Sequence, residues 1–326
     1  MVGINVKFVG KKVNRVRFKP DGQNLASSAH CLLVSGSWDD QPNSLCLWSC
    51  PTGFPAYDEP NANQAINCLH KFDISSDIDD LCFAGADFVA VALASGDVRL
   101  FRCGSKELQE QQCWKQLHPG YPCTAVASRG PTKLASVGED GRLCQLEQGR
   151  HEAVRCLGKA DSGAPTCLRF VRHDHVAVGN LAGHVHLWDL NSPDRRPTQD
   201  LFWAGEQVTC MGQHPSQGHL LASGASSGRL CLWDLRQGRL PTATLAAPAQ
   251  GALADMVFEP EGALLFCASN GSLLRWGNPG LPRGGVELES LVRPQGRPLN
   301  SLDLRGPLVA TGSDSEAIFL LTLGRD

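Results

Sequence analysis

The chain has 326 residues, 42% of them hydrophobic, and a net charge of −3. This content excludes wholesale disorder, and the length allows one large domain or two ordinary ones. The near balance of 30 Lys and Arg against 33 Asp and Glu argues against a general nucleic-acid-binding protein, which needs uncompensated cations. No apolar run approaches the roughly 18 residues of a transmembrane helix, and we expect no signal peptide because the N-terminus lacks an uninterrupted apolar stretch.

The N-terminal segment alternates basic and apolar residues. The basic ones are Lys7, Lys11, Lys12, Arg15, Arg17 and Lys19. This alternation predicts strands with one solvated face, and residues 5–9 are the first of them. A targeting signal or a nucleic-acid patch is the alternative interpretation.

A short pattern then recurs along the chain: a turn residue, alternating apolar positions and a final large apolar residue. Its clearest copy is GRLCLWDL at residues 228–235. The final positions are Trp48, Phe101, Leu146, Trp188, Trp233, Trp276 and Leu321. They lie 42–45 residues apart, except for 53 between the first two. Short strands with a period of about 40–45 residues are typical of a β-propeller with four strands per blade. We therefore predict an all-β, seven-bladed propeller that residues 1–326 form as a single domain.

Two irregularities in the repeat have structural consequences. Residues 49–69 are rich in Pro, Asn, Ala and Gly and account for the long first interval, so we expect a surface loop there. The seventh repeat runs out at Leu323, directly after its third strand. We therefore predict that residues 5–9 supply the outer strand of the last blade, which closes the ring and pairs an open edge.

The repeats resemble the WD40 family over essentially the whole chain. Two of them carry the Trp-Asp dipeptide, at residues 188–189 and 233–234. The resemblance implies turn aspartates, for which the matching positions are Asp39 or Asp40, Asp140 and Asp314. Three repeats lack the tryptophan and the Gly-His dipeptide that usually opens a repeat is missing, so we expect the family's buried Asp-His-Ser-Trp network to be mostly lost.

Cysteine and histidine are the residue types in this sequence that best suit a transition metal. The fourteen cysteines are spread along the chain, and we expect reduced thiols that pack as small apolar residues. The fourth repeat contains His173, His175, His184 and His186. Two such pairs suit zinc in principle, but packed, hydrogen-bonded imidazoles explain the cluster as well, and no metal site is predicted.

No motif for phosphate binding, serine hydrolysis or zinc proteolysis occurs in the sequence. The expected innermost strands, such as CTAVAS, PTCLRF, VTCMGQ and LADMVF, are apolar or neutral, and we expect no carboxylates to converge there. The prediction is therefore a protein that is not an enzyme, with no catalytic residues, no cofactor and no metal.

The WDLR sequence at residues 233–236 resembles the W-D-x-R box of substrate receptors that dock on cullin-RING ubiquitin ligases. That resemblance implies an adaptor contact for Arg236. The alternative is an arginine that caps its own turn.

Several segments resemble the WD-repeat nucleoporins of the Y-shaped outer-ring subcomplex of the nuclear pore. They are residues 7–20, 35–40, 137–143, 152–155, 232–238 and 306–318. The resemblance implies a scaffold subunit at the nuclear pore that supports transport of mRNA and protein, with a kinetochore role in mitosis. The implied partners are other nucleoporins, chiefly the short-arm α-solenoid nucleoporin, with no direct nucleic-acid contact, membrane insertion or required homo-oligomer.

Candidate partner-binding residues lie in the predicted turns that carry this resemblance. They are Trp38, Asp40, Glu139, Arg142 and Glu316. Polar or aromatic residues beside strand-to-strand turns reach solvent near one rim of a propeller. The alternative is that these turns only stabilise themselves, with Asp140 and Asp314 accepting hydrogen bonds from nearby backbone amides.

Overall fold

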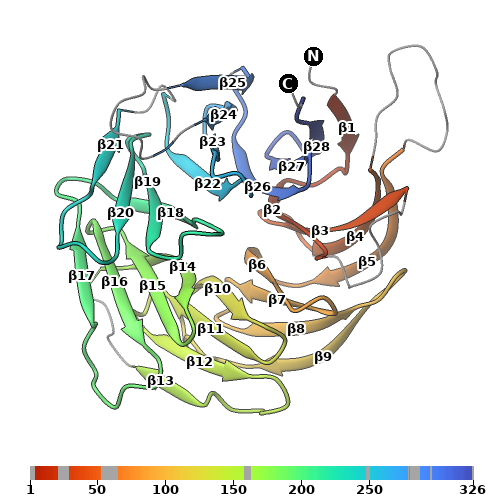
Figure 1. Cartoon of the computed structure of the whole chain (residues 1–326). Coiled ribbons are helices and arrows are strands. Elements are labelled where there is room, and N and C mark those ends of the chain that lie inside the picture. Colours follow the sequence, from red (N-terminus) through yellow and green to blue (C-terminus); the bar gives the residue numbers. More distant parts are fainter. Residues whose placement is uncertain are drawn as a thin grey trace.

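All regular secondary structure in the described residues is β-strand, and no helix occurs among them. The computed structural model describes residues 4–20, 29–52, 65–157, 163–246, 250–277, 279, 287–293 and 296–324. Within these ranges the chain forms seven four-stranded antiparallel sheets, arranged as blades around a central channel (Figure 1). The predicted all-β, seven-bladed propeller is confirmed. No helix able to cross a membrane occurs in the ranges described.

Each blade runs from an innermost strand beside the channel to an outermost strand at the rim. Blade 1 has β2 (Val13–Phe18), β3 (His30–Ser37), β4 (Asn43–Pro51) and β5 (Asn67–Ile74); blade 2 has β6 (Ile78–Ala84), β7 (Phe88–Leu93), β8 (Val98–Cys103) and β9 (Leu108–Trp114). Blade 3 has β10 (Cys123–Arg129), β11 (Lys133–Gly138), β12 (Leu143–Glu147) and β13 (Arg155–Leu157); blade 4 has β14 (Pro165–Arg172), β15 (His175–Asn180), β16 (His184–Asp189) and β17 (Gln199–Phe202). Blade 5 has β18 (Val208–Gln213), β19 (Leu220–Ala225), β20 (Leu230–Asp234) and β21 (Ala243–Leu245); blade 6 has β22 (Leu253–Phe258), β23 (Leu264–Ala268), β24 (Leu273–Trp276) and β25 (Leu288–Val292). Blade 7 has β26 (Leu299–Arg305), β27 (Leu308–Ser313), β28 (Ala317–Thr322) and β1 (Ile4–Phe8).

Blade 7 combines the two ends of the chain. β1 pairs antiparallel with β28, from Ile4 opposite Leu321 to Phe8 opposite Ala317. The Val9 N–H extends this ladder by donating to the Glu316 carbonyl at 2.8 Å. The predicted closure by the N-terminal strand is confirmed, with the strand beginning one residue earlier than expected. The two chain ends consequently lie beside each other (Figure 1).

The hydrophobic core is divided into seven layers, each packed between two neighbouring blades. The seven repeat-ending residues all lie on third strands and are buried, from Phe101 at 0% to Trp276 at 6% exposed. Because one face of each strand packs on the preceding blade and the other on the following blade, both faces must be apolar. This explains why the strands read as nearly continuous apolar runs.

The long connection in blade 1 is shorter than predicted at both ends. β4 continues to Pro51 and β5 begins at Asn67, so residues at each end of the predicted 49–69 loop belong to strands. Residues 53–64 of that loop lie outside the described residues.

One cysteine pair differs from the expectation of reduced thiols. Cys144 of β12 and Cys156 of β13 lie directly opposite each other, with Cα atoms 4.1 Å apart, and form a disulfide. The expectation is wrong for this pair because the register of two neighbouring strands brings together residues that no cysteine motif marks. The other twelve cysteines are free and most of them are buried. Burial raises the pKa of Cys46 and Cys103 to about 11, which keeps these thiols protonated.

Candidate interaction surfaces

Trp38 connects the first and last blades. It follows β3, and its indole Nε1 donates to Asp314 Oδ1 in the turn between β27 and β28 at 3.0 Å. Asn300 Nδ2 donates to the same oxygen at 2.7 Å. Trp38 is half-buried, so this predicted contact residue also braces the junction between blades 7 and 1.

Two further predicted residues near this junction reach solvent. Glu316 is exposed and has a φ of +59° in the β27–β28 turn. Asp40 is half-buried beside the exposed Asp39, which has a φ of +56° and pairs with Lys12. The structure therefore brings Trp38, Asp40 and Glu316 into neighbouring turns on one face of the disc.

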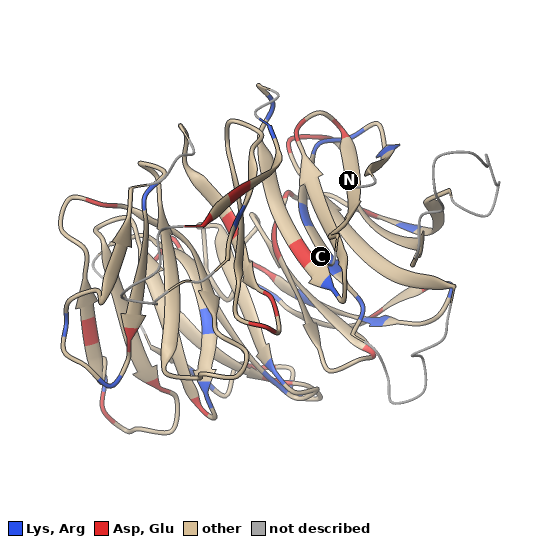
Figure 2. Ribbon diagram, turned by 45° about the horizontal axis from the view of Figure 1, so that its top comes forward, with Lys and Arg blue, Asp and Glu red and all other residues tan. Residues whose placement is uncertain are grey.

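The third predicted turn lies in blade 3, apart from the other two. Glu139 is exposed, and the Arg142 side chain is 43% exposed with its Nε 3.3 Å from Asp140 Oδ2. Both residues follow the second strand of blade 3, and the other two turns follow the second strands of blades 1 and 7. All three turns therefore lie on the same face, because every blade runs outward with the same strand directions. Lys, Arg, Asp and Glu are interspersed over the disc rather than separated by sign (Figure 2).

Asp140 belongs to a buried network that the sequence analysis expected to be mostly lost. His118 Nδ1 lies 2.8 Å from Asp140 Oδ1, and His118 Nε2 lies 3.2 Å from the Ser136 hydroxyl. Leu146 stands where the family has tryptophan. Blade 3 thus retains three of the four members, with the histidine supplied by the connection from blade 2. Burial lowers the pKa of His118, although the hydrogen bond that its imidazole donates to Asp140 opposes the shift.

The tryptophan end of this network is retained in other blades. Trp48 Nε1 donates to Ser35 at 2.8 Å, and Trp233 Nε1 donates to Ser223 at 2.9 Å. Trp188 is buried but its Nε1 has no hydrogen-bond partner among the described residues. The strand register places Val178 where the other two blades have serine, which accounts for the unpaired indole.

Charged side chains meet in the central channel, where apolar or neutral strands were expected. Arg17 of β2 donates through Nη1 to Asp255 Oδ2 of β22 at 2.9 Å, and Arg15 Nε donates to Asp80 of β6 at 3.2 Å. Arg169 of β14 adds a third guanidinium, with Nη2 3.6 Å from Asp255. The expectation that no carboxylates converge here is therefore wrong. Each of the inner strands that supply these groups contributes only one or two charges, and closure of the ring brings them together.

These ion pairs are shielded from water. The side chains of Arg17 and Asp255 are 11% and 5% exposed. Burial alone would raise the pKa of Asp255, but Arg17 and Arg169 lower it to about 2. At Asp79, on the same strand as Asp80, burial prevails and raises the pKa to about 7. The space among these groups is about 20 Å³, comparable to one water molecule.

The basic residues of the N-terminal segment consequently have two environments. Arg15 and Arg17, whose side chains are 19% and 11% exposed, point into the channel. The prediction of a solvated strand face is wrong for them because β2 is an innermost strand. Lys7 and Lys11 precede β2 and remain partly exposed.

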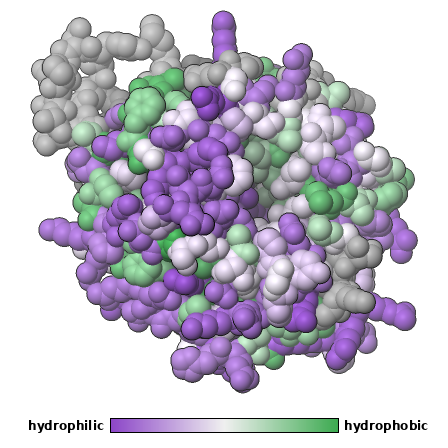
Figure 3. Space-filling view, turned by 180° about the vertical axis from the view of Figure 1, so that it is seen from behind, coloured by the Kyte–Doolittle hydropathy of each residue, from purple (hydrophilic) through white to green (hydrophobic). Residues whose placement is uncertain are grey.

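The channel widens to a cavity of about 450 Å³ at one end. Phenylalanines from four inner-strand ends line it, and Asp303 lies among them. Figure 3 shows one face of the disc as mainly hydrophilic, with a hollow near its middle and scattered hydrophobic patches.

The histidines of the fourth repeat separate into two locations. His175 lies opposite Asp189 at one end of its hairpin, whereas His184 and His186 lie toward the other end. His184 Nδ1 is 2.7 Å, and His186 Nε2 is 3.3 Å, from Asp200 Oδ1. Within the described ranges this is the one group whose donor atoms are close enough to hold a metal ion. The shared carboxylate oxygen already accounts for the arrangement of both imidazoles.

Arg236 folds back onto its own turn. Its Nε and Nη2 donate to the two carboxylate oxygens of Asp234 at 2.9 and 2.7 Å. These hydrogen bonds lower the pKa of Asp234, whose side chain is 5% exposed. A turn-capping role therefore accounts for Arg236 without a contact to another protein.

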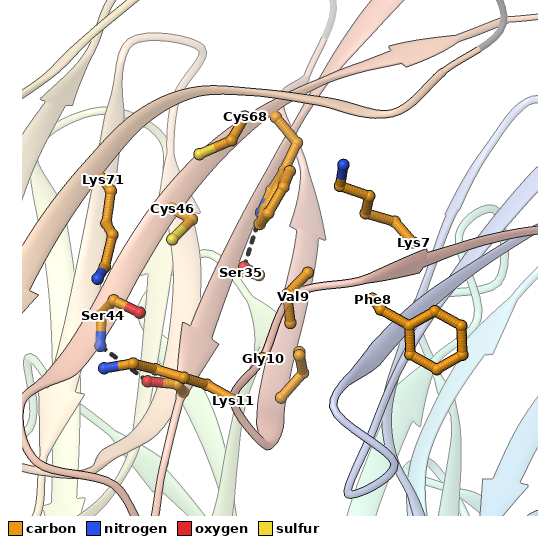
Figure 4. A pocket seen from close by; sticks show the side chains of 13 residues that line it. Lys7, Phe8, Val9, Gly10, Lys11, Ser35, Ser44, Cys46, Cys68 and Lys71 are labelled. Carbon is orange, nitrogen blue, oxygen red and sulfur yellow. Dashed lines mark hydrogen bonds between the residues drawn. The ribbon is translucent and has the colours of Figure 1, made fainter.

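A cavity of about 320 Å³ separates β1 from the outer half of blade 1 (Figure 4). Lys7, Lys11 and Lys71 line it, Trp48 contributes part of its wall, and no carboxylate does. The ring of Phe8 points away from it (Figure 4). Serine, cysteine and tryptophan side chains thus form the interior of the cavity, and lysines lie around its edge.

Matches to known proteins agree with this architecture. Residues 199–234 match the WD domain, G-beta repeat family. This range covers β17 and the three inner strands of blade 5, so the sequence repeat is offset from the blade by one strand. Nucleoporin Nup43 of Homo sapiens and that of Mus musculus are each 28% identical over 98% of this chain and 98% of their own. WD repeat-containing protein 55 of Pongo abelii is 27% identical over 56% of this chain and 47% of its own. The chain is therefore a seven-bladed β-propeller that matches the WD-repeat family model over residues 199–234 and resembles nucleoporin Nup43 along nearly its whole length.

Proposed function

We propose that this protein is a non-enzymatic scaffold subunit of the nuclear pore complex. The observation that supports this most strongly is the resemblance to Nup43 over 98% of both chains, which leaves no large part of either protein unmatched. A rigid ring with many turns and strand edges suits the binding of other proteins. The paired charges in the channel are consistent with a structural rather than a catalytic centre.

In this proposal the protein resides at the nuclear pore, in the outer-ring Y-shaped subcomplex, and supports transport of mRNA and protein. Its principal partner is the short-arm α-solenoid nucleoporin, and it acts at the kinetochore in mitosis. The partner-facing surface is the face that carries Trp38, Asp40, Glu139, Arg142 and Glu316. Trp38 contributes by holding blades 7 and 1 together, and the exposed acidic and basic residues contribute direct contacts.

Reconstitution with the short-arm solenoid nucleoporin tests both the partner and the face. We expect the two proteins to co-elute in size-exclusion chromatography. The triple variant Glu139→Lys, Arg142→Glu and Glu316→Lys should weaken binding in calorimetry while retaining the wild-type circular dichroism spectrum. These substitutions leave Asp140 and Asp314 in place, so the turns keep their hydrogen bonds.

The matched control is the triple variant Glu152→Lys, Arg172→Glu and Glu261→Lys. These three residues are exposed and lie in turns on the opposite face or, for Arg172, at the end of the strand that leads into one, and the net charge changes by the same amount. Equal affinity of the two triple variants for the solenoid nucleoporin would show that the interface lies elsewhere than on the proposed face. Failure of the wild-type chain to bind would contradict the proposal that the short-arm solenoid nucleoporin is its partner.

A further inference from the structure

The outermost strand of blade 7 exposes three apolar residues at alternating positions. Ile4, Val6 and Phe8 of β1 are 50%, 40% and 73% exposed. Edge strands are normally protected by charged residues, proline or bulges, because an open edge recruits other strands. Within β1 the single charge is Lys7.

Another outermost strand of the same molecule, β9, has a protected edge. β9 is the outermost strand of blade 2, and its consecutive exposed residues are Gln109, Glu110 and Gln111. Both strands have the same position in their blades, so the fold alone does not demand exposed apolar residues at the rim.

The backbone of β1 is oriented to accept a further strand. The Val9 N–H donates inward, to Glu316 of the β27–β28 turn. Because inward and outward orientation alternate along an antiparallel strand, the N–H and C=O groups of Ile4, Val6 and Phe8 point outward. β1 pairs with β28 on one side and is the last strand of its sheet on the other.

The two faces of β1 differ in chemistry. Side chains at Ile4, Val6 and Phe8 form the apolar face, while Lys7 lies on the opposite face and lines the 320 Å³ cavity. Lys7 has no ion-pair partner within the described part of the chain, and Lys11 and Lys71 lie around the same cavity. Lys71 also pairs with Asp73 at 3.2 Å, so Lys7 is the cation most available to a partner.

We propose that the outer edge of β1 binds an extended segment of a partner nucleoporin as a fifth strand of blade 7. Addition of a strand to a sheet edge derives affinity from backbone hydrogen bonds and specificity from alternate side chains. The segment carries apolar residues at alternating positions beside Ile4, Val6 and Phe8. Acidic residues at the intervening positions face Lys7 and the mouth of the cavity. This inference rests on the proposed scaffold function for the source of the segment.

Amide hydrogen exchange of the full chain tests the proposal directly. The probe is a short synthetic peptide in which valine and glutamate alternate, and a peptide with lysine in place of glutamate is its control. We expect the glutamate peptide to slow exchange at the amides of Ile4, Val6 and Phe8 by about tenfold or more. Exchange at Gln109 and Gln111 of β9 should not change, and the lysine peptide should bind more weakly.

Two variants separate edge binding from loss of the fold. Val6→Lys places a charge on the apolar face of β1, and Lys7→Glu reverses the charge on its opposite face. Each variant should abolish the protection of the β1 amides by the glutamate peptide. Gln111→Lys on β9 is the matched control and should leave it intact. Thermal melts show whether β1 stays paired with β28 in each variant. If Val6→Lys lowers the melting temperature, the result for Lys7→Glu decides the test.

Each outcome distinguishes this inference from the proposed function. No peptide binding, protection outside β1, or equal affinity for both peptides overturns the edge proposal. If the solenoid nucleoporin binds while the β1 amides still exchange freely, the edge proposal falls and the scaffold function stands. If the peptide protects β1 but the solenoid nucleoporin does not bind, the scaffold function falls and the edge remains a strand-binding site.

Discussion

Arg17 and Asp255 form an ion pair at 2.9 Å although 238 positions separate them in the chain. They belong to blades 1 and 6, and Ser301 of blade 7 lies between them. The Ser301 hydroxyl accepts from Arg17 at 2.8 Å and donates to Asp255 at 3.0 Å. This relay joins three blades across the point where the ring closes, so it supports the closure from the inside.

Removal of Asp255 should therefore destabilise the whole ring. Asp255→Ala leaves the Arg17 guanidinium buried without its closest partner, and the loss of one member of a buried pair costs about 3–5 kcal/mol. Urea unfolding measures the effect. Asp194→Ala, at an exposed position, should stay within about 0.5 kcal/mol of wild type. A similar small loss for Asp255→Ala would show that the channel pairs do not support closure.

Stability should fall as pH rises from about 4 to 7, because burial raises the pKa of Asp79 to about 7. In that range the folded state holds a proton that the unfolded state, with an ordinary pKa of about 3.9, has released. Asp79→Asn removes this contribution. Melting temperatures measured between pH 5 and pH 8 should decline less steeply in the variant than in wild type. Parallel profiles for the two proteins would exclude Asp79 as the titrating group.

Trp233 should be more sensitive than Trp188 to loss of the indole N–H. Both are buried, but Trp233 donates to Ser223, whereas Trp188 Nε1 is unpaired. Trp233→Phe should therefore cost about 1 kcal/mol more than Trp188→Phe in denaturant unfolding. Replacement of either residue by alanine should cost about 3–5 kcal/mol. Alanine losses below about 1 kcal/mol would mean that these side chains do not hold the blades together.

Deletion of residues 1–10 should lower the melting temperature and promote aggregation. The deletion removes β1 and exposes the edge of β28, which pairs with it over five positions. An unpaired apolar edge recruits other chains. Light scattering during a thermal melt measures both effects. A deletion variant that melts like wild type would show that β1 contributes nothing to closure.

The fold was predictable because the same pattern is repeated seven times. Each copy places a large apolar residue on the third strand of a blade, and interblade packing demands apolar residues on both strand faces. The missing strand after Leu323 and the spare strand at residues 5–9 together implied the closure. These inferences depend only on local pattern and on counting.

The channel and the apolar edge could not be predicted in the same way. Arg17, Asp80 and Asp255 are single charges in otherwise apolar strands, and only the closed ring brings them together. The alternation in β1 predicts that the side with Lys7 is solvated and the apolar side buried, whereas Val6 and Phe8 are exposed and Lys7 is partly buried. Register likewise decides that Cys144 meets Cys156.

Pairing between the first and last strands also has a consequence for biosynthesis. β1 is synthesised before the strands of the other six blades and its partner β28 after them, so blade 7 cannot form until β28 has left the ribosome. Six blades can fold while the ring is still open, and the final blade then locks it. A chain that terminates early would lack β28 and leave β1 without a partner. Closure of the ring therefore depends on the synthesis of every strand from β1 to β28.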